Sequence, residues 1–422
     1  MILAIALVLI LVLLSLGAHV AAVLGLVTAV IVLSVSGVPA TVIAQTAFSS
    51  VNSYPLIAIP MFILAGNLMM RGNIAALMID LVGSIVRAIR GGLALTVLTC
   101  SVFFAAVSGS SVGSAAAIGR STVAGLREEE YPPRFAAAIV AVGGTLGLMI
   151  PPSLGFILIG SIVGLPIDRL FIAGLLPGIM EATLLSVATF WLSRHGNYGA
   201  KTTAPDWKKF GQLLPRTLPA LLMPVLVLGS IYTGFMTPTE VSAFAAAYAL
   251  LLCLFVYRSI NLRGIWETTR ESLLQTSMIF AVVMGGSMLG FILARMGVSA
   301  QLVGSLQEAG LTWWQFLIVV NLVLLAMGMF LDGIALIVLT APLLFPMAQA
   351  LGIDPVHFAV IMVANVEIAT LTPPIGLNLF VMSGIARIPV HEVARGVLPF
   401  YAVRLTGLAL VSFIPAISLA LI

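Results

Sequence analysis

Charged residues are scarce in this chain. Only 8% of its 422 residues are Asp, Glu, Lys or Arg, whereas 61% are hydrophobic. A soluble globular domain has about 25% charged residues, so the composition excludes that class. We therefore expect an all-α polytopic membrane protein that is embedded in the lipid bilayer.

Cysteines and cofactor motifs are also few or missing. The two cysteines, Cys100 and Cys253, both lie in apolar segments, which argues against a disulfide framework and against a metal site. The sequence contains no Walker motif, dinucleotide-binding fingerprint or zinc-ligand spacing. We therefore expect no ATP hydrolysis by this chain, no cofactor and no nucleic-acid partner.

Apolar windows of about 20 residues, the length that crosses a bilayer, recur along the chain. They predict spans at 2–16, 18–36, 54–70, 134–164, 170–192, 216–235, 239–257, 273–294, 355–386 and 398–422. Run 2–16 lacks the basic region of a signal peptide, so we expect a retained first span. Stretches 74–90 and 262–275 mix charged and apolar residues at helical spacing, which is typical of interfacial helices, either as bracing arms or as plain connections. The polar segment 195–215 is expected to link two halves.

One unusual pattern occurs twice. Pro151-Pro152 and Pro373-Pro374 interrupt apolar runs at an offset of 222 residues, and Pro177 and Pro399 share that offset. A Pro-Pro pair breaks a helix because two backbone donors are missing and the preceding residue is pushed out of the α region. In lipid, broken backbone persists only where it is buried in protein or lines a cavity. Two broken helices in corresponding halves indicate a secondary transporter with a site near the membrane midplane.

Two further apolar regions, 91–125 and 313–350, have small or polar residues at their middle. We interpret each as a re-entrant helical hairpin that enters the membrane and returns on the same side. The predicted fold thus contains two repeats, each with a hairpin and a broken helix. The second broken helix is the fifth span after the first, an odd number, so we expect the repeats to be inverted in the membrane. The expected division is a first scaffold with its arm (1–90), a first transport unit (91–165), connecting and scaffold segments (166–312), a second transport unit (313–386) and a C-terminal span (387–422).

The placement of Lys and Arg predicts the orientation, because basic residues favour the cytoplasmic side. With the N-terminus outside, nearly all basic residues between spans fall in the cytoplasm, and only Arg169 and Arg295 fall outside. Both termini are therefore expected on the periplasmic side. The first hairpin then opens from the cytoplasm and the second from the periplasm.

The tip of the first hairpin is the first candidate site. Ser108, Gly109, Ser110 and Ser111 supply hydroxyls and carbonyls that lack intrahelical partners. Hard cations favour oxygen ligands, so we predict that Na⁺ binds between this tip and the break from Thr145 to Pro152. Close helix packing by small residues is the alternative reason for such a cluster.

The second hairpin has an acidic tip. The corresponding candidates are Asp332 and Gly333 at the tip and Asn365, Thr370, Thr372 and Pro373 at the break. A carboxylate at membrane depth costs roughly 2.5–3.5 kcal/mol on insertion scales. We therefore predict that Asp332 is a cation ligand or the electrostatic partner of a bound cation. Capping of the returning helix is the alternative role, and both roles are compatible.

Other polar residues give weaker signals. Glu181 and Glu367 lie in apolar spans, where each could be protonated or paired internally, and Arg404 also lies within an apolar segment. Arg295 ends a span on the outer side, where it either snorkels to the interface or guides an anionic substrate. The pentapeptide around Ser111 matches G-x-S-x-G, but no histidine is expected beside it, which argues against a hydrolase.

Several long motifs make the chain resemble the large membrane subunit of tripartite ATP-independent periplasmic (TRAP) transporters over essentially its full length. In the first half they are YPLIAIPMFILAGNLM (54–69), IRGGLA (89–94), SGSSVGSAAAIG (108–119) and MIPPSLGFILIG (149–160). In the second half they are TPTEVSAFAAAYAL (237–250), GIDPVHFAVIMVANVEIATLTPPIGLNLF (352–380) and VLPF (397–400). Two positions differ from the usual family pattern, namely Ser114, where Asp is common, and Ala369, where Gly is usual.

The resemblance implies a sodium-coupled importer of small organic anions, such as C4-dicarboxylates or sialic and sugar acids, in the bacterial inner membrane. It implies an elevator-type ion-transporter fold and an elevator mechanism, with a small membrane subunit and a periplasmic substrate-binding protein as partners. Na⁺ would be held at Ser108–Ser111 with the 145–152 break, and at Asp332-Gly333 with Thr370–Pro373. Substrate would bind near Ser111, Ser153 and Asn378, with Arg295 as a further candidate.

Two other function classes remain open at this point. The first is a sodium/carboxylate symporter of the wider ion-transporter group that needs no binding protein. The second is a channel. Dependence of uptake on an added binding protein separates the first from a TRAP transporter, and saturable sodium-dependent uptake excludes the second.

Overall fold

Helices are the only regular secondary structure in the part of the chain that the computed structural model describes, which is residues 9, 12–13, 16–34, 38–199 and 204–422. Eight helical segments there are long and apolar enough to cross a membrane, at Tyr54–Arg71, Pro133–Val163, Ile167–His195, Trp207–Tyr232, Pro238–Val256, Leu262–Arg295, Gly333–Ala350 and Val390–Phe413. The predicted all-α membrane fold is confirmed. The expected span 2–16 lies largely outside the described residues.

The first half contains the expected hairpin and broken helix. The hairpin consists of α6 (Gly92–Ser108) and α7 (Ser111–Glu128). The broken helix consists of α8 (Pro133–Met149) and α9 (Leu154–Val163), and the Pro151-Pro152 peptide bond between them is cis. The long helix α10 (Ile167–His195) follows and packs against α8 and α6.

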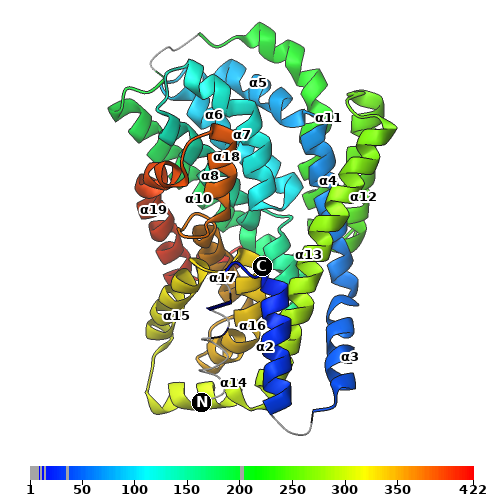
Figure 1. Cartoon of the computed structure of the whole chain (residues 1–422). Helices are drawn as coiled ribbons and strands as arrows, with labels where there is room; N and C mark the ends of the chain where they lie inside the picture. The colour runs from blue at the N-terminus through cyan, green and yellow to red at the C-terminus, as the bar shows by residue number, and fades with distance from the viewer. Residues whose placement is uncertain (1–8, 10–11, 14–15, 35–37, 200–203) are drawn as a thin grey trace.

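The second half repeats this order. Its hairpin is α15 (Trp313–Gly328) and α16 (Gly333–Ala350), its broken helix is α17 (Pro355–Ala369) and α18 (Leu377–Ala386), and α19 (Val390–Phe413) and the short α20 (Ala416–Leu419) follow. The Pro373-Pro374 bond is also cis. In Figure 1, α6 and α7 lie toward one end of the molecule and α15 and α16 toward the other. The two repeats are therefore inverted relative to each other.

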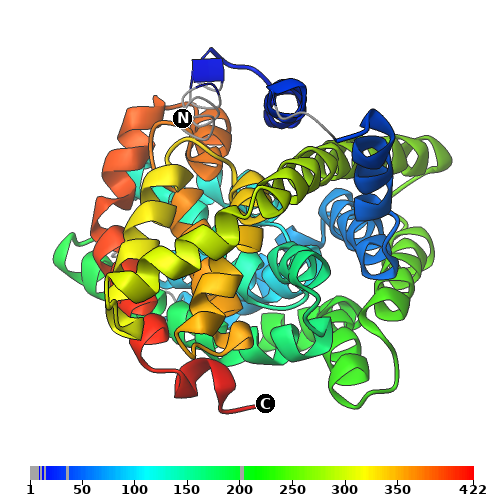
Figure 2. The same ribbon diagram turned by 90° about the horizontal axis from the view of Figure 1, so that it is seen from below.

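The remaining helices lie beside these two units. They are α2 (Val20–Ser34), α3 (Ala40–Val51), the 3₁₀ turn η1 (Tyr54–Ile57), α4 (Ala58–Arg71), α5 (Ile74–Val86), α11 (Trp207–Tyr232), α12 (Pro238–Leu251) with the π-helical turn η2 (Leu252–Val256), α13 (Leu262–Arg295) and α14 (Val298–Glu308). α13 packs against α2, α3 and α4, and α12 packs against α4. Seen from below in Figure 2, the blue N-terminal helices and the red C-terminal helices occupy different sides of the molecule.

The prediction that 262–275 forms a helix separate from the span 273–294 is wrong. α13 is one continuous helix of 34 residues, because neither a proline nor an intervening turn interrupts it. At 1.5 Å per residue it is about 51 Å long, which exceeds the roughly 30 Å hydrocarbon core of a bilayer. Its charged N-terminal part can therefore extend beyond the membrane while remaining one rigid element.

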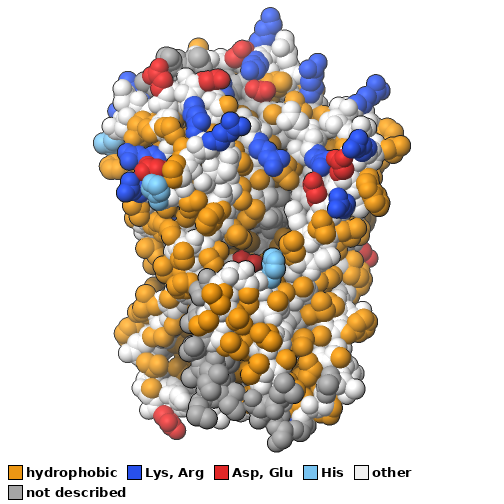
Figure 3. Space-filling view, viewed as in Figure 1, with side chains coloured by type: hydrophobic (Ala, Val, Ile, Leu, Met, Phe, Trp, Pro, Cys, Tyr) orange, Lys and Arg blue, Asp and Glu red, His pale blue; other side chains and the backbone are white. Residues whose placement is uncertain are grey.

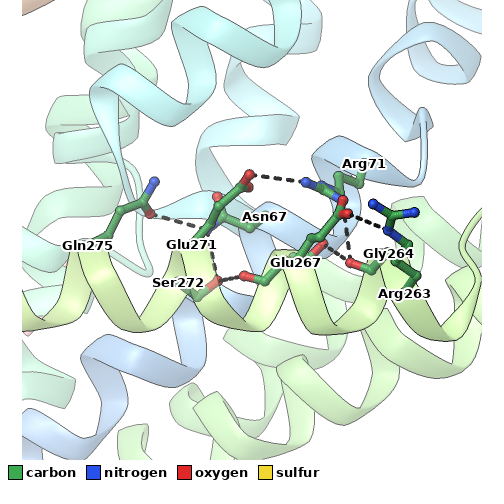
Figure 4. A network of polar contacts seen from close by, with 9 residues as sticks. Asn67, Arg71, Arg263, Gly264, Glu267, Glu271, Ser272 and Gln275 are labelled. Atoms are coloured by element: carbon green, nitrogen blue, oxygen red, sulfur yellow. Dashed lines mark hydrogen bonds and ion pairs between the residues drawn. The ribbon is translucent and has the colours of Figure 1, made fainter.

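A polar network stabilises that charged part of α13. Figure 4 shows Arg71 of α4 between Glu267 and Glu271 of α13, with nitrogen–oxygen distances of 2.9 and 3.0 Å. One turn earlier on α4, the amide of Asn67 donates to Ser272 at 2.9 Å. The network therefore holds the charged part of α13 against α4.

The linker, two short helices and the start of the last span also differ from expectation. The linker between halves is shorter than 195–215, because α10 continues to His195 and Asp206 caps α11 by accepting from the Lys209 backbone N–H at 2.8 Å. The helices α3 and α14 were not anticipated, since neither is long enough to register as a span. The last span begins at Val390 rather than 398.

Candidate functional site

The tip of the first hairpin touches the first break through backbone. The carbonyl of Gly109 accepts from the Leu154 N–H at 3.2 Å. Gly109 has a φ of +61°, and a Cβ added there would lie 2.6 Å from the Pro152 carbonyl oxygen. Only glycine meets both conditions, since other residues rarely adopt this φ and any Cβ would collide with the break. The tip and the break are therefore held together by this residue.

The serine hydroxyls of this tip form a local network. The Ser108 hydroxyl lies 2.7 Å from that of Ser114, and the Ser110 hydroxyl caps α7 by accepting from the Gly113 N–H at 3.2 Å. Ser108 and Ser111 are each only 4% exposed. Ser114, which stands where the family commonly has Asp, thus contributes a neutral oxygen next to Ser108.

The second hairpin meets the second break in the same way. The Met329 carbonyl accepts from the Ile375 N–H at 3.2 Å, which is the counterpart of the contact between Gly109 and Leu154. A Cβ on Gly328 would lie 2.4 Å from the Cβ of Ala369, so the glycine that allows close approach lies on the hairpin rather than on the broken helix. The replacement of the usual glycine by Ala369 is therefore compensated across the contact.

Asp332 caps the returning limb of the second hairpin. Its Oδ1 accepts from the Ala335 N–H at 2.7 Å, so the capping alternative is confirmed. Gly333 follows at the start of α16, where an added Cβ would lie 2.4 Å from a methyl carbon of Val366. Asp332 is only partly buried, as is Ser110, whereas Ser108 and Ser111 are buried. One carboxylate oxygen is thus used for the cap, which leaves the charge available to a nearby cation.

The polar residues predicted at the second break make hydrogen bonds to α15 and to their own helix. Asn365 is fully buried and donates to Asn321 Oδ1 at 2.8 Å. Within the described part of the chain, the Asn365 Oδ1 atom is buried without a hydrogen-bond partner. Thr370 donates to the Glu367 carbonyl at 2.8 Å, and Thr372 donates to the Ile368 carbonyl at 2.7 Å. Pro373 is exposed, whereas the prolines of the first break are buried.

One contact joins the two repeats at the predicted substrate residues. The amide of Asn378, on α18, donates to the Ser111 hydroxyl at 2.7 Å and to the Ala141 carbonyl of α8 at 2.9 Å. Asn378 is fully buried, and among the described residues its Oδ1 atom has no partner. The structure therefore brings Ser111 and Asn378 together across a separation of 267 residues.

Ser153 and Arg295 lie outside that direct contact. Ser153 is fully buried at the first break, where its hydroxyl donates to the Leu148 carbonyl and caps α9 by accepting from the Phe156 N–H. Arg295 is exposed at the C-terminal end of α13, on the scaffold. The break thus contains Ser153, whereas Arg295 belongs to a different part of the molecule.

A buried charged cluster around Arg404 was not predicted from the sequence. The Arg404 guanidinium donates to Glu181 of α10, to Glu367 of α17 at 3.1 Å and to the Thr145 hydroxyl of α8. Arg404 is 2% exposed, Glu181 3% and Glu367 not at all. The offset of 222 residues is the sequence signal that could have indicated this cluster. It relates Thr145 to Glu367, and it relates Glu181 to Val403, which precedes Arg404.

The chemistry of these sites is that of oxygen ligands and amide donors. Within the described residues, no group of three or more His, Cys, Asp or Glu side chains could hold a metal ion. The Ser111 hydroxyl accepts from an amide, and its hydrogen-bonded neighbour in the structure is Asn378. The arrangement at each tip is suited to a hard monovalent cation or a polar solute.

Comparison with known proteins agrees with this architecture. Residues 7–417 match the family model described as tripartite ATP-independent periplasmic transporter, DctM component. The C4-dicarboxylate TRAP transporter large permease protein DctM of Pseudomonas aeruginosa is 38% identical over 376 residues, which are 89% of this chain and 87% of that protein. The sialic acid TRAP transporter large permease protein SiaM of Vibrio cholerae is 33% identical over 378 residues, covering 90% of this chain and 88% of that protein.

A solved structure has the same fold. The YdaH transporter of Alcanivorax borkumensis matches with a TM-score of 0.60 and 16% sequence identity, covering 95% of this chain and 98% of that chain. At this identity the likeness concerns the fold alone. The family match over nearly the whole chain and the two large-permease relatives show that this multi-pass membrane protein is not an enzyme but a member of the tripartite ATP-independent periplasmic transporter family, in its DctM component.

Proposed function

We propose that this chain is the permease subunit through which a bacterial inner membrane takes up small organic anions in symport with Na⁺. The named relatives transport C4-dicarboxylates and sialic acid, according to their names, and both are carboxylates. Carboxylate-bearing solutes are therefore the proposed substrate class, with Na⁺ as the coupling ion.

The observation that favours Na⁺ is the buried, unpartnered oxygen at the second break. Native structures leave few buried polar atoms unsatisfied, and a bound ion is one explanation for such an atom. The Asn365 Oδ1 atom fits this role beside Thr370, Thr372 and the carbonyls before Pro373. Asp332 and Gly333 complete the proposed second site, in which the carboxylate compensates the cation charge.

The proposed first sodium site lies at the other tip. It consists of Ser108, Gly109, Ser110 and Ser111 with the residues of the first break. Thr145 is its least favourable member, because its hydroxyl already accepts from the Arg404 guanidinium. A cation placed against that group would be repelled.

The substrate is proposed to bind between the two sodium sites. Ser111 and Asn378 offer a hydroxyl and an amide at the point where the repeats meet, and Ser153 lies at the adjacent break. Arg295, at the end of α13, is proposed to attract the anion toward the site from the outer side.

The orientation is proposed from the charge distribution. Figure 3 shows Lys and Arg side chains gathered at one end of the molecule on the face in view. We propose that this end is cytoplasmic, in line with the positive-inside rule, and that both termini are periplasmic. A small membrane subunit and a periplasmic substrate-binding protein are the proposed partners, as membership of the family implies.

We also propose an elevator mechanism, in which the two hairpins and broken helices move against the scaffold. In support, the scaffold helix α13 touches α16 of the transport unit through glycine. A Cβ on Gly286 would lie only 2.0 Å from a methyl carbon of Val338. The absence of a side chain at Gly286 lets the two helices approach closely, and packed helices can slide past one another in shear motions.

Reconstituted vesicles provide the test. Purified chain with its small subunit is placed in liposomes, and uptake of a labelled C4-dicarboxylate and of sialic acid is measured with and without the binding protein. Uptake is expected to require the binding protein and to stop when choline replaces Na⁺ at constant pH. Uptake without the binding protein would favour the self-sufficient symporter, and undiminished uptake driven by a pH gradient alone would refute sodium coupling.

A further inference from the structure

The charged cluster around Arg404 joins four helices. One nitrogen, Nη1, donates to carboxylate oxygens of Glu181 on α10 and Glu367 on α17. The other, Nη2, donates to the Thr145 hydroxyl and, at 3.2 Å, to the Val142 carbonyl, both on α8. The two ends of one planar guanidinium thus bind the two broken helices, one end to each.

The cluster lies where the two inverted repeats meet. The offset of 222 residues relates Thr145 on α8 to Glu367 on α17. The same offset relates Glu181 on α10 to residue 403, which neighbours Arg404 on α19. Four helices, two from each repeat and equivalent in pairs, therefore meet at one group of side chains.

Stability alone does not explain these charges. Two carboxyl groups and one guanidinium are almost completely buried, and taking charges out of water is costly. Replacing such a group by apolar side chains of similar volume is often neutral or stabilising. What apolar residues cannot reproduce is the direction of the contacts, because the guanidinium fork holds partners at fixed angles on two sides.

Short paths lead from the cluster to both candidate sites. Thr145 lies on the last turn of α8 before the first break. On the other side, the carbonyl of Glu367 accepts from Thr370 of the second break. Ala141 directly precedes Val142 on α8, and its carbonyl accepts a hydrogen bond from Asn378 of the candidate substrate site.

We propose that Arg404 is a positioning residue that holds the two breaks at a fixed separation, so that both ion sites and the substrate site between them move as one body. This inference deepens the proposed function, on which it rests. Without the contacts of Arg404, each repeat would shift separately, and the coupling between the two ion sites would be lost. Coupling between linked sites typically changes affinity by roughly 5- to 150-fold.

The test uses an apolar triple variant, Arg404→Met with Glu181→Leu and Glu367→Leu. Spin labels are attached at Glu128→Cys on α7 and Gln349→Cys on α16, both exposed, after replacement of the buried Cys100 and Cys253 by alanine. We expect the variant to remain folded but to show a broadened distribution of label distances. Its uptake should also lose cooperativity for Na⁺, toward the behaviour of independent sites.

The scaffold provides a matched control. Arg71 with Glu267 and Glu271 is also one arginine between two glutamates, but these ion pairs join α4 to α13 rather than the two broken helices (Figure 4). The triple variant Arg71→Gln, Glu267→Gln, Glu271→Gln should leave the distance distribution and the sodium dependence unchanged.

Two outcomes overturn the proposal. One is an apolar triple variant with a native distance distribution and native sodium dependence. If that variant fails to fold, Arg404→Lys provides the test instead. Its single ammonium keeps the charge but cannot donate to partners on two sides at fixed angles, as the guanidinium does. A narrow distribution and normal uptake in Arg404→Lys would then contradict the proposal. Since the distances are measured without transport, a sodium-independent wild type would refute the proposed function and leave this test standing.

Discussion

At the scale of single residues, Asp332 combines an observed helix cap with the proposed role at a cation, and substitutions can separate the two. Asparagine caps helices about as well as aspartate, so Asp332→Asn should retain the cap to the Ala335 N–H while removing the charge. We expect near-normal thermal stability and a higher Na⁺ concentration for half-maximal uptake. Measurement of uptake against Na⁺ concentration checks this.

The companion variant Asp332→Ala removes the cap as well. Loss of an N-cap costs about 1 kcal/mol. A lower melting temperature is therefore expected in addition to the higher Na⁺ concentration for half-maximal uptake. If Asp332→Asn has normal sodium dependence, the carboxylate acts only as a cap.

Gly109 is the residue at which the first tip tolerates no change. Alanine there would have to adopt a φ of +61° and place its Cβ 2.6 Å from the Pro152 carbonyl oxygen. The left-handed conformation alone costs roughly 1–2 kcal/mol. We expect Gly109→Ala to abolish uptake because the tip is displaced from the break.

Gly113, four residues along the chain, is the control for this change. An added Cβ would meet nothing closer than the Ser110 hydroxyl at 3.4 Å, an ordinary contact. Because alanine favours a helix by about 1 kcal/mol over glycine, Gly113→Ala should keep uptake and stability. Equal behaviour of the two variants in uptake and melting assays would contradict this account of the tip.

At the scale of elements, the contact between α13 and α16 limits how the scaffold and the transport unit approach each other. Gly286→Ala would place a Cβ 2.0 Å from a methyl carbon of Val338, which is a stiff side chain. Overpacking of this kind typically costs about 1–3 kcal/mol. We expect slower uptake, measured in vesicles, together with a lower melting temperature.

A compensating change makes this prediction specific. Val338→Ala removes the opposing methyl groups, so the double variant Gly286→Ala, Val338→Ala should recover much of the lost uptake rate. Gly290→Ala, one turn away, should be nearly neutral because its nearest neighbour is a Pro342 carbon at 3.5 Å. A double variant no better than Gly286→Ala would count against the steric explanation.

At the scale of the whole molecule, relative motion of two bodies is tested by locking them together. A Cβ on Gly290 of α13 would lie 3.7 Å from the Cβ of Pro342 of α16, which is within the range of about 3.5–4.5 Å found in disulfides. Gly290→Cys with Pro342→Cys, in a background without Cys100 and Cys253, should therefore form a cross-link. We expect oxidation to stop uptake and reduction to restore it.

The control uses the same thiols in their reduced state, which should transport as the cysteine-free background does. Mass analysis confirms that the bond has formed. Undiminished uptake by a fully cross-linked protein would show that α13 and α16 do not move past each other during transport.

The sequence by itself determined the features that depend on local chemistry. Paired prolines remove backbone donors, so both breaks were predicted at Pro151-Pro152 and Pro373-Pro374, between α8 and α9 and between α17 and α18. Small and acidic residues end apolar helices, so both hairpin turns were also predicted. The identical offset of the two pairs was sufficient to predict two repeats, and the odd number of spans between the two broken helices predicted their inversion.

Only the tertiary structure decided which distant side chains meet. Arg404 and Thr145 are 259 residues apart, and Asn378 and Ser111 are 267 residues apart. Helical periodicity predicts contacts only between near neighbours in the sequence, so it cannot predict these two contacts. The tertiary structure likewise decided that the charged part of α13 lies against α4, where Arg71 pairs with Glu267 and Glu271. The local sequence determines which oxygen atoms each tip offers. The packing of the two repeats determines their hydrogen-bond partners, because a buried polar group is stable only where another part of the chain makes a hydrogen bond to it.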